Sequence, residues 1–145
     1  MHSILHRITI ESTPEKLFQA LTTQQGLSDW WTKTKTNGDK VGSTNRFFFG
    51  AGGSHQVDMQ IETLKTNELV VWKCIGGPWV ESGVFTFSIT PDDRGAVLHF
   101  NHQGWNKTDD FYQHCNCKWG YFLAVSLKSY LEKGVGQPHP QDPNI

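Results

Sequence analysis

His102 is the side chain in this sequence best placed to perform acid–base chemistry. It alternates with Leu98 and Phe100, so in an extended segment its imidazole would share their apolar face. Histidine changes its charge near neutral pH, which suits a general acid, a general base or a group that hydrogen-bonds a bound molecule. A hydrogen-bonded structural histidine near the end of a strand would explain the same position. The sequence leaves both roles open.

The run His114-Cys115-Asn116-Cys117 combines residue types that bind zinc. A structural zinc site needs four tetrahedral ligands. On a helix, Cys115 and Cys117 would be separated by about 200°, so their thiols cannot bind one ion from the same face. His114 and Cys117 share a face, but the sequence offers no obvious partners to complete the set. We therefore expect no metal and no cofactor, and we expect the cysteines to be free thiols.

Aromatic side chains are unusually abundant, with nine Phe, six Trp and three Tyr making up 12% of the chain. Such residues can fill a small core, since each buries roughly 150–250 Å². They can also line a ligand site, because ligand pockets are mostly apolar with a few polar groups. Each aromatic residue taken alone fits the core better, and the sequence pattern by itself does not choose between the two roles. If a ligand site exists, the candidate contacts are ten residues: Trp31, Phe47, Met59, Trp72, Phe85, Phe87, Phe100, His102, Trp119 and Leu123.

Sequence signatures of common catalytic sites are missing. There is no Gly-x-Ser-x-Gly, no phosphate-binding Gly-x-x-x-x-Gly-Lys, no His-Glu-x-x-His and no dinucleotide fingerprint. The glycine-rich residues 51–54 lie between two expected strands, which favours a hairpin loop over an anion site. We predict no catalytic residue and favour a non-enzymatic ligand-binding protein. A shaped cavity can assist cyclisation without a motif, so a cyclase or hydrolase remains the alternative.

Length and charge exclude several broad classes of protein. The 145 residues correspond to one domain, and 13 Lys+Arg against 14 Asp+Glu leave a formal net charge of -1. This balance is not typical of proteins that bind nucleic acid or anionic membranes. No apolar run approaches the ~20 residues of a membrane helix, and the N-terminus lacks the features of a signal peptide. Three cysteines do not suggest a secreted disulfide framework, so we expect a cytoplasmic protein.

The first third of the chain predicts one strand followed by two short helices. Residues 4–10 alternate between apolar and polar side chains, which indicates a strand with one buried face. Residues 12–21 begin with a Ser-Thr pair that can cap a helix, and Pro14 suits its first turn. A second short helix is expected within residues 22–31. The polar residues 32–37 are expected to form a loop.

The remainder predicts a sheet and then one long helix. Turn-forming residues separate five further strand-like segments, at residues 41–49, 55–62, 69–75, 82–90 and 96–102. The last element has helical periodicity, with one apolar side made by Cys115, Trp119, Leu123, Leu127, Tyr130 and Leu131. Gly134 is expected to end this helix. The sequence thus predicts an α+β fold, in which a curved antiparallel sheet of six or seven strands wraps around a long C-terminal helix.

This order of elements resembles the helix-grip fold of the START-like (SRPBCC) superfamily. More narrowly, the chain is similar to the activator of heat-shock protein ATPase homologues, in their small bacterial single-domain form. The resemblance is carried by residues 12–22, Trp30-Trp31, the strand end at residues 102–105, and residues 119–134 of the last helix. It implies a single START-like domain over residues 1–134, followed by a proline-containing tail over residues 135–145.

The resemblance also implies a function. Members of the superfamily hold lipid-like, polyketide-like or aromatic molecules between the sheet and the long helix. We therefore expect this protein to bind or carry a small hydrophobic molecule, in contact with the ten candidate residues named above. We expect it to act as a monomer or a homodimer, without nucleic acid or membrane insertion. The co-chaperone that names the family implies a further alternative, an interaction module with a chaperone partner and a role in the stress response. In the enzyme alternative, His102 would assist proton transfer.

Overall fold

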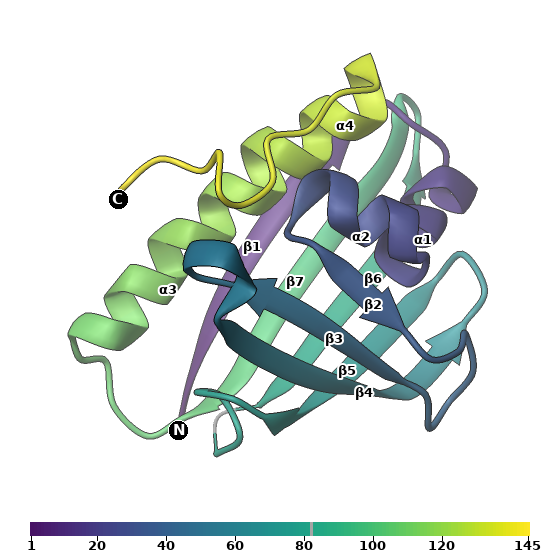
Figure 1. Cartoon of the computed structure of the whole chain (residues 1–145). Helices are drawn as coiled ribbons and strands as arrows, with labels where there is room; N and C mark the ends of the chain where they lie inside the picture. Colours follow the sequence, from purple (N-terminus) through teal and green to yellow (C-terminus); the bar gives the residue numbers. More distant parts are fainter. Residues whose placement is uncertain (82) are drawn as a thin grey trace.

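The computed structural model describes residues 1–81 and 83–145, and its centre is a curved antiparallel sheet (Figure 1). Seven strands of the described residues pair in the order β1-β7-β6-β5-β4-β3-β2. Their bounds are β1 His2–Ile10, β2 Thr34–Thr36, β3 Thr44–Phe49, β4 His55–Lys65, β5 Leu69–Gly76, β6 Val84–Asp92 and β7 Gly95–Trp105. The expected sheet is confirmed, with the larger of the two expected strand numbers.

The helices pack on one face of this sheet (Figure 1). Two short helices follow β1, α1 over Pro14–Thr22 and α2 over Gln24–Trp30. The long helix comprises α3 (Asp110–Tyr121), the π-helical turn η2 (Phe122–Leu127) and α4 (Lys128–Lys133). Thr13 caps α1 by accepting a hydrogen bond from the Lys16 amide at 3.1 Å, which removes one of the unpaired N–H groups at the helix start. The α+β helix-grip architecture is confirmed.

The core lies between the sheet and the helices and contains most of the aromatic side chains. Ring centroids are 4.6 Å apart for Trp72 and Phe87, 5.1 Å for Phe87 and Phe100, and 4.5 Å for Phe100 and Trp119. The inward-facing residues of each strand are buried as alternation predicts, including His102, whereas His99 on the opposite face is exposed. Much of the aromatic excess therefore packs the interior of the domain.

Two local predictions about the strands were wrong. The expected loop at residues 32–37 contains β2, in which Thr34 pairs with Phe47 of β3. No apolar alternation marks this strand, because its buried side chain is a threonine whose hydroxyl donates to the Thr32 carbonyl. The strand expected from residue 41 begins at Thr44, because residues 40–43 form a turn closed by the Ser43 amide and the Lys40 carbonyl. The strand expected over residues 82–90 is β6, and Ser82 itself is outside the described residues.

The C-terminal segment, residues 135–145, packs against the helices. Gly134 ends α4 in the left-handed conformation at φ 83°, as expected, and the chain then runs back along the long helix (Figure 1). The Gln137 amide donates to Ser126 Oγ at 2.8 Å, and the His139 amide donates to the Trp31 carbonyl at 2.7 Å. These contacts place the C-terminal segment next to α2 and η2. Among the described residues, no helix combines the length and apolar composition needed to cross a bilayer.

Candidate functional site

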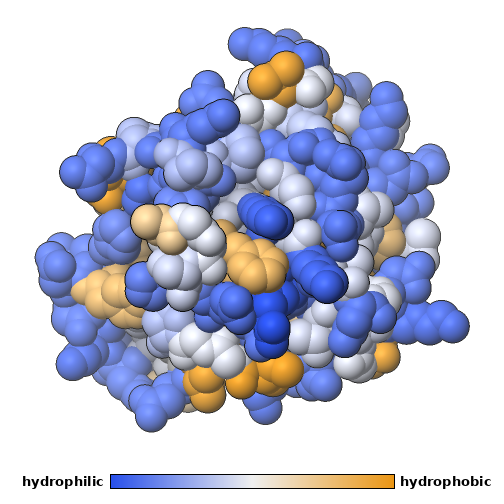
Figure 2. Space-filling view, viewed as in Figure 1, coloured by the Kyte–Doolittle hydropathy of each residue, from blue (hydrophilic) through white to orange (hydrophobic). Residues whose placement is uncertain are grey.

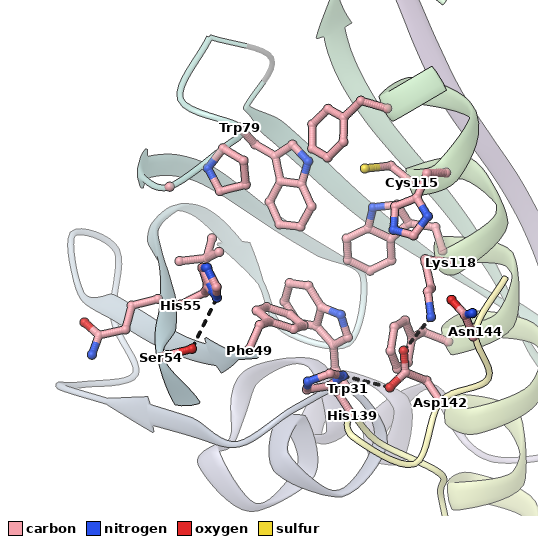
Figure 3. Close-up of a pocket in the computed structure, with 18 residues that line it drawn as sticks. Trp31, Phe49, Ser54, His55, Trp79, Cys115, Lys118, His139, Asp142 and Asn144 are labelled. Atoms are coloured by element: carbon pink, nitrogen blue, oxygen red, sulfur yellow. Dashed lines mark hydrogen bonds and ion pairs between the residues drawn. The ribbon is translucent and has the colours of Figure 1, made fainter. Parts of the chain in front are cut away.

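A cavity of about 740 Å³ opens beside α3, at one end of the sheet–helix core (Figure 3). Five parts of the chain form its walls: the end of α2 at Trp31, the β3–β4 connection with the adjoining strand ends, the loop that follows β5, α3 with the start of η2, and the C-terminal segment. Ligand pockets in proteins commonly have volumes of roughly 300–1,000 Å³. The cavity is therefore large enough to hold a small organic molecule.

Aromatic side chains form the inner wall of the cavity. Trp31 follows α2 and Trp119 lies on α3, and their ring centroids are 4.9 Å apart. Phe49, at the end of β3, packs against Trp31 with a centroid distance of 5.5 Å. Trp79 closes the opposite side from the loop after β5 (Figure 3). These flat surfaces can pack against an apolar or aromatic molecule with little loss of conformational entropy, because the core holds Trp31 and Trp119 in place.

A charged cluster lies where α3 meets the C-terminal segment (Figure 3). Lys118 Nζ is 2.6 Å from Asp142 Oδ2, and His139 Nδ1 is 2.8 Å from Asp142 Oδ1. Only 9% of the Asp142 side chain and 20% of the Lys118 side chain are exposed. Burial raises the pKa of Asp142, but the hydrogen bonds from Lys118 and His139 outweigh it and hold this pKa below its ordinary value. The carboxylate is therefore ionised at neutral pH and accepts both hydrogen bonds.

Two further histidines, His55 on β4 and His114 on α3, lie at the cavity wall and are exposed. Ser54 Oγ lies 3.4 Å from His55 Nδ1. Within residues 1–81 and 83–145, no group of three or more His, Cys, Asp or Glu side chains is arranged to hold a metal ion. The histidines are thus available to the cavity as individual hydrogen-bonding groups.

Cys115 contributes a thiol to the cavity wall, whereas Cys117 on the same helix is exposed outside it. This difference agrees with the separation of about 200° expected from their spacing on a helix. Burial raises the pKa of the Cys115 thiol to about 11. Burial also raises the pKa of Cys74, which lies in the core on β5. Both buried thiols therefore stay protonated at neutral pH.

We expect iodoacetamide at pH 8 to alkylate Cys117 and to leave Cys115 and Cys74 largely unmodified. Only the thiolate reacts, and a pKa of about 11 leaves about one Cys115 thiol in a thousand ionised at pH 8. Mass spectrometry of the digested protein gives the labelling rate at each site. In urea all three cysteines should react at similar rates, which serves as the control. Equal rates in the folded protein would contradict the burial of Cys115.

The structure brings two of the ten predicted ligand contacts, Trp31 and Trp119, to the cavity wall. The other eight lie in the core with at most 1% of their surface exposed and do not line the cavity: Phe47, Met59, Trp72, Phe85, Phe87, Phe100, His102 and Leu123. Some of them support the wall from behind, since the Phe47 ring is 4.4 Å from that of Trp31. The cavity wall therefore lies closer to the protein surface than eight of the ten predicted contacts, which pack behind it.

Sequence reasoning missed the wall residues that come from loops and from the C-terminal segment. Trp79 lies between Gly77-Pro78 and Gly83. A large aromatic residue within such a turn-rich stretch could have indicated a loop that contacts a ligand. Asp142 and Asn144 had no such signal, because their segment has neither helical nor strand periodicity. Their place at the cavity follows only from the way the C-terminal segment folds back on α3.

Comparisons with known proteins agree with this fold. Residues 11–132 match the family described as Activator of Hsp90 ATPase homolog 1-like protein. The solution structure of the Aha1 dimer from Colwellia psychrerythraea is 39% identical, with a TM-score of 0.80 over 94% of this chain and 100% of that chain. The protein SSP2350 from Staphylococcus saprophyticus is 18% identical, with a TM-score of 0.77 over 93% of this chain and 95% of that one.

A further similar structure is DynU16, described as a putative protein in the dynemicin biosynthetic locus. It is 15% identical, with a TM-score of 0.72 over 92% of this chain and 48% of that chain. At such identities, SSP2350 and DynU16 support the fold alone. Among curated proteins, no sequence matches this chain significantly.

Proposed function

Since the chain belongs to the family of Activator of Hsp90 ATPase homolog 1-like proteins, we propose that it binds or carries a small hydrophobic molecule in the cavity beside α3. The observation that carries this proposal is the cavity of about 740 Å³, whose inner wall is aromatic and is backed by the buried core. A lipid-like, polyketide-like or aromatic molecule fits this description.

Apolar burial supplies the driving force for such binding. Removing apolar surface from water stabilises the complex by about 25 cal/mol per Å² before the costs of association are subtracted. Because the core fixes Trp31 and Trp119, these rings need little ordering when a ligand arrives. The charged cluster of Lys118 and Asp142 at one end can orient a ligand that carries a polar group.

Titration of the full chain with a fatty acid, a flavonoid and a polycyclic aromatic compound tests the proposal. Trp31, Trp79 and Trp119 line the cavity, so their fluorescence should change as a ligand enters. We expect at least one of the three classes to bind with a Kd below about 100 μM, or roughly -5.5 kcal/mol. Failure of all three to reach this affinity would overturn the proposed function.

The paired variants Cys115→Phe and Cys117→Phe locate the binding site. The Cys115 side chain lies in the cavity wall, so a phenyl ring there would occupy ligand space. We expect this variant to weaken binding at least about tenfold, or 1.4 kcal/mol. Cys117 is exposed outside the cavity, and its variant adds the same ring to the same helix without that effect. Equal loss of affinity in both variants would place the ligand elsewhere.

The alternatives receive less support. His102 does not line the cavity, which leaves the enzyme alternative without its acid–base group at this site. A chaperone-associated module predicts a broad exposed apolar patch. On the face drawn in Figure 2, the described hydrophilic side chains predominate, and the apolar ones form small separate groups. The relative from Colwellia psychrerythraea was solved as a dimer, and size-exclusion chromatography would test whether this chain is also a homodimer.

A further inference from the structure

We infer that the molecule bound in the cavity is an amphipathic acid, whose anionic headgroup takes the place of the Asp142 carboxylate at Lys118. This inference rests on the proposed function and specifies its class of ligand. Three observations support it: Lys118 lies in the cavity wall, both groups to which it donates belong to the C-terminal segment, and the wall contains few negative charges.

Lys118 is a cation within a largely apolar wall. It neighbours Trp119 on α3 and lies about one helical turn from Cys115, and all three residues line the cavity. Its ammonium group donates to Asp142 Oδ2 at 2.6 Å and to the Pro143 carbonyl at 2.5 Å. A lysine ammonium has three hydrogens, so these two bonds leave one for an acceptor inside the cavity. Lys118 can therefore bind an oxygen of a ligand.

Both partners of Lys118 belong to the C-terminal segment, which lies outside the residues 11–132 that match the family. The segment brings the Asp142 carboxylate to Lys118 from beyond the end of the long helix (Figure 3). Within the molecule, Asp142 thus occupies the position that the headgroup of an acidic ligand would take.

The charges of the wall favour an acid over a neutral or basic ligand. Among the described residues that line the cavity, Asp142 is the one carboxylate. The other polar side chains there include three histidines and the amides of Gln56 and Asn144, which can donate hydrogen bonds. An acid that displaced Asp142 would therefore meet one cation and several N–H donors, and no second carboxylate.

Exchange of one carboxylate for another keeps the charge of Lys118 compensated. Removing a partner from a buried ion pair is costly because the remaining charge has no counter-ion. A ligand acid avoids this cost, and the displaced Asp142 becomes hydrated. A neutral ligand of the same shape leaves the Lys118–Asp142 pair unchanged, so it can accept only the third ammonium hydrogen of Lys118 and forms no ion pair of its own.

Decanoate and decanol test the inference because they share one alkyl chain and differ in the headgroup. With the full chain at pH 7, calorimetry should give decanoate an affinity at least about tenfold higher than that of decanol, or 1.4 kcal/mol, because only the carboxylate can replace Asp142 at Lys118 and also accept from the N–H donors of the wall. Equal affinities would overturn the inference and leave the proposed function standing. Absence of binding by either compound would overturn the inference, and would also count against the lipid-like class in the proposed function.

Two variants on opposite sides of the ion pair should act in opposite directions. Lys118→Met should abolish the preference for decanoate, and Lys118→Arg should retain it, because arginine keeps the cation. Asp142→Asn should raise the affinity for decanoate at least about threefold more than it changes the affinity for decanol, since Lys118 loses its internal counter-ion. If Asp142→Asn instead weakens both ligands equally, the pair is purely structural and the inference fails. Near-UV circular dichroism checks folding, and Asp142→Asn decides the question alone if Lys118→Met does not fold.

Discussion

Replacing Phe87 with alanine should lower the free energy of unfolding by about 3–5 kcal/mol and leave the affinity for a cavity ligand unchanged. Phe87 is fully buried on β6, where its ring lies 4.6 Å from that of Trp72 and 5.1 Å from that of Phe100. Truncation would remove apolar burial and leave a void that these large rings cannot fill without moving their strands. Because Phe87 does not line the cavity, the ligand site should survive in the folded fraction.

Urea denaturation measures the stability of this variant, and titration below the unfolding transition measures its ligand affinity. Thr86→Ala is the matched control, since Thr86 is the neighbouring residue on the opposite face of β6 and is only partly buried. It should cost far less stability. A folded Phe87→Ala protein with weakened ligand binding would show instead that the ligand reaches the inner aromatic layer, as the sequence predicted.

Ser126→Ala should lower the free energy of unfolding by about 1–3 kcal/mol and also weaken ligand binding. The fully buried Ser126 hydroxyl in η2 donates to the Trp30 carbonyl at 2.5 Å and accepts from the Gln137 amide at 2.8 Å. Alanine would remove a hydrogen-bond partner from both backbone groups, and a buried polar group without a partner carries its full desolvation cost. The C-terminal segment would then be held less firmly against η2, and the cavity wall that contains His139 and Asp142 would loosen.

Hydrogen exchange of residues 135–145 reports this loosening directly, alongside urea denaturation and ligand titration. Ser129→Ala is the control, because the Ser129 hydroxyl also donates to the C-terminal segment, at the Val135 carbonyl and a distance of 2.7 Å. That bond is exposed, so water can replace the hydroxyl at little cost. Equal effects of the two variants would contradict a special role for Ser126.

Local patterns account for most of the fold that the sequence predicted. On β4, Val57, Met59 and Ile61 alternate with polar residues, and all three are buried. Alternation reports a face of a strand because successive side chains point to opposite sides. The Pro14 start of α1 and the Gly134 end of the long helix were likewise readable from local backbone preferences. The strand β2 escaped prediction because its pairing with β3 leaves no apolar pattern in three residues.

The candidate site was predictable only in part. Trp31 and Trp119 were recognised from their positions at the end of a helix and on an apolar helix face, and both line the cavity. Phe85 and Phe87 also point into the domain from β6, yet neighbouring side chains cover them completely. Periodicity gives the direction of a side chain but not the depth at which it lies, because depth depends on what packs against it from other elements.

By itself, the sequence determined the alternating strands, the capped helices, their order and therefore the family, since these features depend on interactions between residues close together in the chain. Only the tertiary structure decided which aromatic rings border empty space and which fill the core. It also decided that Asp142 lies 2.6 Å from Lys118, across 24 positions of sequence. That contact depends on the C-terminal segment folding back along the long helix, where its backbone amides donate to the Trp31 carbonyl and to the Ser126 hydroxyl, and such bonds leave no periodic pattern in the sequence.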